Sequence, residues 1–176
     1  MGKKPRGRTL AEFQPLQPAE KLLLGACADG LLAEIGQDRP TERTDDNAVR
    51  AEFLRFLVLG GDDDAPVHEQ GVRLQGAWVE GVLNLSNALI PFGLSCLKCY
   101  FEQPLESMGS RFQGLVSLSG SYLPGWWADR ANLNGSVFLR DGFKASGEVR
   151  LLGAQIEGNV DCSKAEFEGK EGDALS

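Results

Sequence analysis

Apolar residues alternate with single polar residues in short triplets that recur along residues 72–167. Written in rows of eleven, most rows begin with an apolar-x-apolar triplet, such as Val72 with Leu74, or Val116 with Leu118. Alternation with a period of two is typical of a strand that buries one face. Because glycines recur just before the triplets, the pattern predicts very short strands separated by tight corners.

A second pair of columns in each row combines a small residue with a large apolar one two places later, as in Ala77 with Val79 and Cys99 with Phe101. One row cannot bury these residues alone, whereas stacked rows form a continuous apolar interior. Two rows make a coil of about 22 residues with four faces. The chain is therefore predicted to be mainly β, a right-handed parallel β-helix of quadrilateral cross-section.

A heptad or leucine-rich repeat does not fit column steps of five and six residues. The alternative, a β-sandwich, does not predict the small-large pairing.

The period is irregular in two places. In rows of eleven one residue is missing around residues 124–130, where Trp127 falls in the first inward column, and one is added around residues 143–146. These irregularities predict a bulged corner or a protruding loop.

Helical spacing of apolar residues precedes the repeat and predicts two helices, over residues 22–35 and 48–59. In the first helix, Pro18 suits the first turn and Gly36 suits the end. In the second helix, Asp46 or Asn47 suits the N-cap position. The organisation expected is a basic flexible tail (1–16), a helical N-terminal cap (17–66), the parallel β-helix (67–168) and a polar, unstructured tail (169–176). No cap follows Phe167, so the last coil is predicted to be an open edge. Either the natural chain continues beyond it, or this end binds a protein partner or self-associates.

Charge and hydropathy exclude some functions. The net charge is −7, and four of the basic residues stand in the first eight positions, so the folded body is more acidic still. Such a body repels phosphate backbones, and nucleic-acid binding is not expected. No stretch reaches the ~20 apolar residues that cross a bilayer, and no signal peptide is apparent, so a cytoplasmic location is expected.

Few residues are candidates for chemistry, and no cofactor or metal is expected. Cys96 and Cys99 have the CxxC spacing of redox or zinc sites, but both fall in inward columns and are interpreted as buried structural cysteines. His68, the single histidine, is interpreted as a solvated loop residue. No GxGxxG motif opens a helix after a strand, which disfavours a nicotinamide or flavin site.

Two features are candidates for interaction. Glu80, Glu102 and Glu157 (with Glu168) share one outward column of the eleven-residue rows, where stacked carboxylates could hold a cation or a basic partner, although a solvated corner is the simpler interpretation. Trp126 and Trp127 stand where the register slips. Their side chains should point to opposite faces, one into the core and one toward a partner.

Three strings carry a family resemblance: VHEQGVRLQGAW (67–78), VRAEFLRFL (49–57) and VFLRDGFKASGEVRLLGAQIEGNVDCS (137–163). They resemble bacterial pentapeptide-repeat-like proteins that are often labelled membrane-associated oxidoreductases. The resemblance implies a β-helix. It also implies longer relatives with further coils and a hydrophobic C-terminal region, associated with membranes, so that this chain is expected to be an N-terminal portion or a truncated member. It provides no catalytic residues.

Three functions follow as hypotheses. The first is a non-catalytic solenoid module for interaction or scaffolding, which touches membranes only indirectly. The second is an acidic DNA mimic like some pentapeptide-repeat proteins, which requires acidic stripes along the rod. The third is the oxidoreductase of the family label, for which no catalytic or cofactor motif is found.

Overall fold

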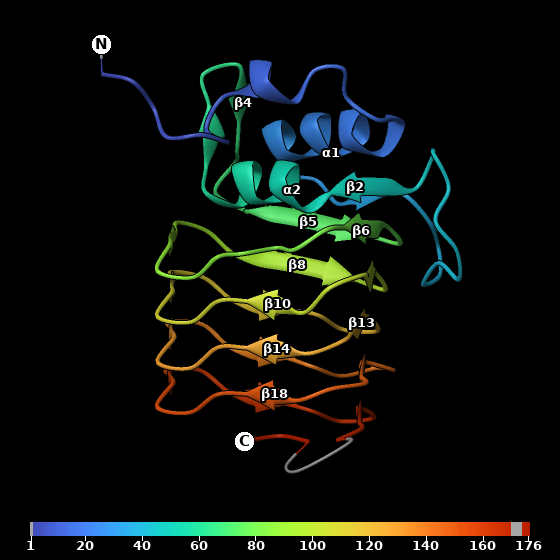
Figure 1. The fold of residues 1–176 in the computed structure, drawn as a ribbon, viewed down its shortest axis with the longest axis vertical. Coiled ribbons are helices and arrows are strands. Elements are labelled where there is room, and N and C mark those ends of the chain that lie inside the picture. The colour runs from blue at the N-terminus through green and yellow to red at the C-terminus, as the bar shows by residue number, and fades with distance from the viewer. Residues whose placement is uncertain (1, 170–173) are drawn as a thin grey trace.

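A computed structural model describes residues 2–169 and 174–176, and it shows a parallel β-solenoid of about four coils beneath a helical cap (Figure 1). Each full coil contributes one short strand to each of four faces, except that the first coil contributes only an isolated bridge at Asn84 to face 3. The prediction of a mainly β, parallel solenoid with about 22 residues per coil is confirmed.

The four faces are parallel sheets. Face 1 contains β1 (Ala33–Glu34), β5 (Val72–Gln75), β8 (Leu94–Leu97), β12 (Val116–Ser117), β16 (Val137–Phe138) and β20 (Val160–Asp161). Face 2 contains β2 (Ala48–Arg50), β6 (Trp78–Glu80), β9 (Tyr100–Phe101), β13 (Tyr122–Leu123), β17 (Lys144–Ala145) and β21 (Glu166–Phe167). Face 3 contains β10 (Leu105–Glu106), β14 (Trp126–Trp127) and β18 (Val149–Arg150), and face 4 contains β7 (Leu89–Ile90), β11 (Arg111–Phe112), β15 (Asn132–Leu133) and β19 (Gln155–Ile156).

The alternation of apolar and polar residues sets which side of each strand faces the interior. In β5 the side chains of Val72 and Leu74 are buried, whereas Arg73 and Gln75 are partly exposed. Val72 pairs with Leu94 directly below it, so the inward residues form continuous apolar stacks. This stacking removes apolar surface from water in every coil and holds the short strands together.

The register of the tryptophan pair differs from the prediction. Leu105 pairs with Trp126, and Trp126 pairs with Val149, so Trp126 and not Trp127 occupies the inward column. The missing residue lies in the corner at Pro124 and Gly125, just before this strand. An alignment in rows of constant length does not show at which residue the deletion lies, because placing the deletion a few residues earlier or later leaves most columns unchanged.

One coil exchanges the small and large inward positions. Leu123 pairs with Ala145, which places a small residue in the large column. Two residues earlier, Phe143 occupies the position that Ser121 has in the coil above, and both Phe143 and Ala145 are fully buried. The exchange keeps the total volume of the pair and so fills the interior.

The cap contains two helices, α1 (Pro18–Asp29) and α2 (Ala51–Val58), and both are shorter than predicted. Helix α1 begins with Pro18 as expected but ends at Gly30, whose φ of 69° is left-handed. Ala48 and Val49, predicted to be helical, lie in β2 instead, because β2 pairs with β6. Strands β1 and β2 thus cover the first coil beneath the helices, and β3 (Gly61–Asp62) and β4 (Ala65–Pro66) form a small antiparallel pair.

Part of the predicted N-terminal tail belongs to the cap. Leu10–Phe13 form a 3-10 helix, η1, and Phe13 is buried with its ring 5.5 Å from that of Phe53 and 5.4 Å from that of Phe56. The prediction of a flexible tail over 1–16 was therefore wrong from residue 10 onward, because it weighed the basic residues and overlooked these apolar ones.

The predicted unstructured tail is also ordered at its end. The backbone N–H of Val149 donates to Ala174, and that of Leu151 donates to Ser176, so residues 174–176 add to β18 on face 3. Residues 170–173 of this predicted tail lie outside the described residues. In the described part of the chain, no helix is both long and apolar enough to cross a membrane.

Candidate interaction surfaces

The two tryptophans divide as predicted, one inside and one outside. Trp126 is fully buried, and its indole Nε1 donates a 2.8 Å hydrogen bond to the Oγ of Ser107. Trp127 is partly exposed on the outer surface of face 3. Of this candidate pair, only Trp127 is placed to contact a partner.

The candidate carboxylates do not form one site. Glu80 and Glu102 stack at the same corner beside face 2, whereas Glu157 follows β19 on face 4. An eleven-residue row is half a coil, so successive rows lie on opposite sides of the rod. Glu80 is also occupied, because it forms an ion pair with Arg43 and accepts a 3.5 Å hydrogen bond from Gln17.

The cysteines of the CxxC spacing, Cys96 and Cys99, are buried and do not form a disulfide bond. The Cys99 thiol contacts the backbone carbonyl of Leu97 at 3.4 Å. A hydrogen bond with Cys99 and burial raise the pKa of the Cys96 thiol, so this thiol is held protonated and unreactive. Cys162, in the last coil, is only partly buried. Within residues 2–169 and 174–176, no group of three or more His, Cys, Asp or Glu residues could hold a metal ion.

His68 lies against the end of α1. Its backbone N–H donates to the carbonyl of Cys27 at 2.8 Å, and its ring Nδ1 accepts from the backbone of Gln70 at 3.1 Å. The ring sits so close to Gly30 that a Cβ there would lie 2.6 Å from Nδ1. These contacts show that His68 packs against the end of α1. The described contacts of its ring include no hydroxyl or thiol that could act as a nucleophile.

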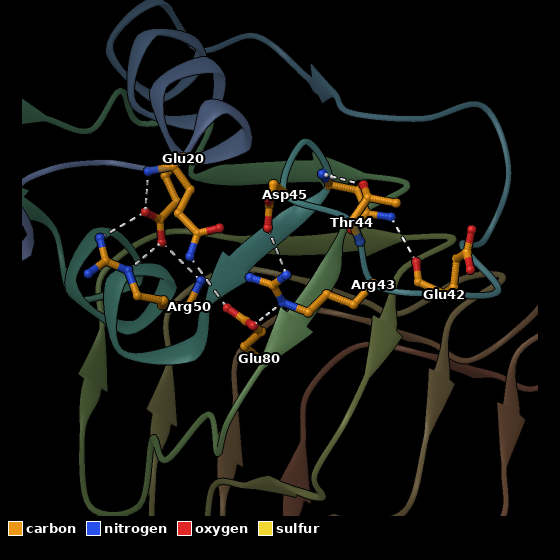
Figure 2. Close-up of polar contacts among 9 residues, drawn as sticks. Glu20, Glu42, Arg43, Thr44, Asp45, Arg50 and Glu80 are labelled. Carbon is orange, nitrogen blue, oxygen red and sulfur yellow. Dashed lines mark hydrogen bonds and ion pairs between the residues drawn. The ribbon is translucent and has the colours of Figure 1, made fainter.

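A buried ion pair in the cap was not predicted from the sequence. Glu20 is fully buried, and its carboxylate accepts hydrogen bonds at 2.8–2.9 Å from the Arg50 guanidinium, from the Arg50 backbone and from the Gln17 backbone (Figure 2). The hydrogen bond to Glu20 raises the pKa of Arg50. All of these oxygens are engaged within the chain, so the pair fixes α1 onto β2 and α2 and is not poised for acid-base chemistry.

The last coil exposes residues whose counterparts are buried. Val160 is 47% exposed, whereas Val137, its partner one coil above, is fully buried. Ile156, Cys162 and Phe167, all inward-facing, are only partly covered. Strands β19, β20 and β21 are the edges of their sheets. Among the described residues, nothing covers the interior of the solenoid at this end. On face 3 residues 174–176 form the last layer below β18, and there Leu175, which pairs with Val149, is 47% exposed.

A groove runs along the outer surface of face 2. The rings of Trp78, Tyr100 and Tyr122 stack from coil to coil, with centroids 4.1 and 4.6 Å apart. The loop of residues 36–47 leaves the cap and descends beside these coils (Figure 1). The space between the loop and the tyrosines, called here the face-2 groove, has a volume of about 640 Å³.

Comparisons of this chain with protein-family profiles, with curated proteins and with solved structures found no match.

Proposed function

We propose that the chain is a non-catalytic β-solenoid module that self-associates through its last coil. The observation that carries the proposal is the exposed interior at this end, where Val160 and Phe167 occupy positions that are buried higher in the rod. Exposed apolar interiors beside unpaired strand edges are surfaces that proteins cover by pairing.

The shape of the open end favours a second copy as its partner. Residues 174–176 form the last layer of face 3, and β20 forms the last layer of face 1 on the opposite side of the rod. A two-fold axis that exchanges faces 1 and 3 would place residues 174–176 of each copy against the β20 edge of the other, with antiparallel strands. Such an isologous contact covers both interiors at once.

The cap limits this association to two copies. Helices α1 and α2 and strands β1 and β2 cover the first coil, so one end of the rod has no free interior for a head-to-tail contact. A rod with one open end forms a closed pair, whereas a rod with two open ends would form filaments.

The outer surface favours this role over DNA mimicry. Mimicry requires stripes of carboxylates, yet the outward positions of faces 1, 2 and 3 are mixed in charge, and those of face 4 (Leu89, Arg111, Asn132 and Gln155) include no carboxylate. Face 2 presents Trp78, Glu80, Tyr100, Tyr122, Lys144 and Glu166, face 1 presents Arg73, Ser95, Ser117, Phe138 and Asp161, and face 3 presents Glu106, Trp127 and Arg150. The stacked Glu80 and Glu102 do not continue as a stripe, because Pro124 and Ser146 follow them in the next two coils. Several carboxylates are also paired with cations one coil away, as Asp161 is with Arg140 at 3.0 Å.

Sedimentation velocity over a wide range of protein concentration tests the proposal. The native chain should sediment as a dimer, and Val160→Glu should sediment as a monomer, because a charge would be buried at the contact. Leu89→Glu is the matched control: Leu89 is 57% exposed on the outer surface of face 4, so its dimer should persist. A native chain that stays monomeric at every concentration, or a Val160→Glu variant that dimerises as well as the control, would overturn the proposal.

A further inference from the structure

We propose that the face-2 groove binds an extended acidic peptide segment. This inference goes beyond the proposed self-association and uses a different surface, on the side of the rod instead of its open end.

The wall of the groove is fixed in place before any ligand arrives. The Nη1 of Arg39 donates to the backbone carbonyls of Gly120 and Gly142, both at 3.2 Å. The Nε2 of Gln75 donates to Gly36 at 3.0 Å, and the Nζ of Lys98 donates to Gln37 at 3.3 Å. These bonds attach the loop of residues 36–47 to several successive coils. A preformed site binds without the entropic cost of ordering its own walls.

The floor of the groove presents the edges of aromatic rings. Both faces of Tyr100 are occupied by stacking on Trp78 and Tyr122, at angles of 16° and 18° between the ring planes, and one face of Tyr122 is occupied by Tyr100. Ring edges carry the positive part of the aromatic quadrupole, and the Tyr100 hydroxyl is a hydrogen-bond donor, whereas the Tyr122 hydroxyl shares a 2.8 Å hydrogen bond with the Oγ of Ser146. Burial is the main cause that raises the pKa of Tyr100, which keeps its hydroxyl protonated. Such a floor suits carboxylate oxygens better than it suits a cation.

The charges beside the floor include cations with no carboxylate partner. Among the described residues, the contacts of Arg39 and Lys98 are with backbone carbonyls and not with acidic side chains. Lys144 is paired with Glu166 and Glu168. Asp38 and Asp141 also line the groove, and Asp141 is paired with Arg140 at 3.4 Å. In a chain with a net charge of −7, two unpaired cations in one groove are a local attraction for an anionic partner.

The spacing of the groove favours a peptide over a small anion. Arg39 contacts Gly120 and Gly142, which lie one and two coils beyond Lys98, so the two unpaired cations are roughly 5–10 Å apart along the rod at the strand spacing of about 4.8 Å. An extended chain rises about 3.3 Å per residue, so acidic side chains about two or three residues apart span Lys98 and Arg39. The volume of about 640 Å³ also exceeds what a single carboxylate would fill.

Isothermal titration of the full chain with an acetylated and amidated tetraglutamate peptide tests the inference. Binding is expected in the native chain, and Lys98→Gln should weaken it about tenfold by removing a charged hydrogen bond. Tyr100→Phe, which keeps the ring stack, should weaken it less, and added salt should weaken it further. Arg111→Gln is the matched control, because Arg111 is an exposed cation on face 4 and should not affect binding.

Four results would overturn the inference: no binding to the native chain, equal binding to the Lys98→Gln variant, equal losses in the Lys98→Gln and Arg111→Gln variants, or full competition by free glutamate at the same carboxylate concentration. Val160→Glu separates this inference from the proposed self-association. A monomeric Val160→Glu variant that still binds the peptide shows that the groove acts alone.

Discussion

At the residue scale, left-handed corners are the positions where single side chains disturb the repeat most clearly. Asn87, Gly109, Arg130 and Gly153 stack in one corner column, and all have a positive φ between 55° and 68°. Glycine adopts this backbone without steric cost, whereas a side chain with a Cβ does not. The glycines of this column are therefore explained by backbone conformation. Asn87 is of a residue type that also visits this region, which leaves Arg130 as the residue least suited to it.

Arg130→Gly should raise the free energy of unfolding by about 0.5–1 kcal/mol, because the strain at Arg130 exceeds the added entropy of the unfolded chain. Urea denaturation of the two chains measures this difference. Gly153→Ala, the reverse change in the same column at a φ of 68°, should lower stability and serves as the control. An Arg130→Gly variant less stable than the native chain would show that the arginine side chain makes a contact that outweighs the strain.

The Glu20–Arg50 pair is the residue-scale feature on which the cap depends. Glu20→Gln should lower the free energy of unfolding by about 3 kcal/mol, because Arg50 loses its charged partner and Gln cannot accept all the hydrogen bonds that the carboxylate accepts. Thermal unfolding followed by circular dichroism measures the loss. Glu52→Gln removes an exposed carboxylate from α2 and should change stability little. Equal effects of the two substitutions would contradict the structural role of Glu20.

At the scale of elements, the exchange of Phe143 and Ala145 shows how a coil keeps its interior filled. Phe143→Ala should lower the free energy of unfolding by about 3–5 kcal/mol, since it leaves a cavity in the stack. The double variant Phe143→Ala with Ala145→Phe restores the small-large order of the other coils and should recover much of this loss. A double variant as unstable as Phe143→Ala would show that the local backbone, and not the interior volume, fixes the order.

The elements predicted well from the sequence are those fixed by repetition. Inward columns such as those of Leu74 and Phe101 recur in every coil, so a period-two pattern and constant spacing identify the strands. Errors arise where a contact distant in sequence decides the structure. Ala48 and Val49 have a helical pattern but form a strand because β6 pairs with them.

The candidate surfaces were predicted less well for a related reason. Glu80 and Glu157 share a column of the eleven-residue rows, yet half a coil separates them around the rod. The face-2 groove joins Arg39, from a loop with no periodic signal, to corners of coils far along the chain. Only the folded rod brings these residues together, so sequence spacing could not indicate the groove.

At the scale of the whole molecule, the rod should open from one end. In a solenoid each coil contacts only its neighbours, so local stability depends on how many neighbours a coil has. The first coil has the cap above it, whereas the last coil has a coil on one side and an open interior on the other. Opening should therefore begin at β20 and β21 and proceed toward the cap.

Hydrogen–deuterium exchange measures this gradient directly. The backbone N–H of Glu166, which donates to Phe143 in the last coil, should exchange much faster than that of Tyr100, which donates to Ala77 near the cap. Protection of the last coil should rise with protein concentration in the native chain, because the proposed dimer covers it, and should not rise in the Val160→Glu variant. Protection that is uniform along the rod would mean that the coils unfold as one cooperative unit. In that case the exposed interior of the last coil would not weaken it, and the gradient argued from nearest-neighbour stacking would be wrong.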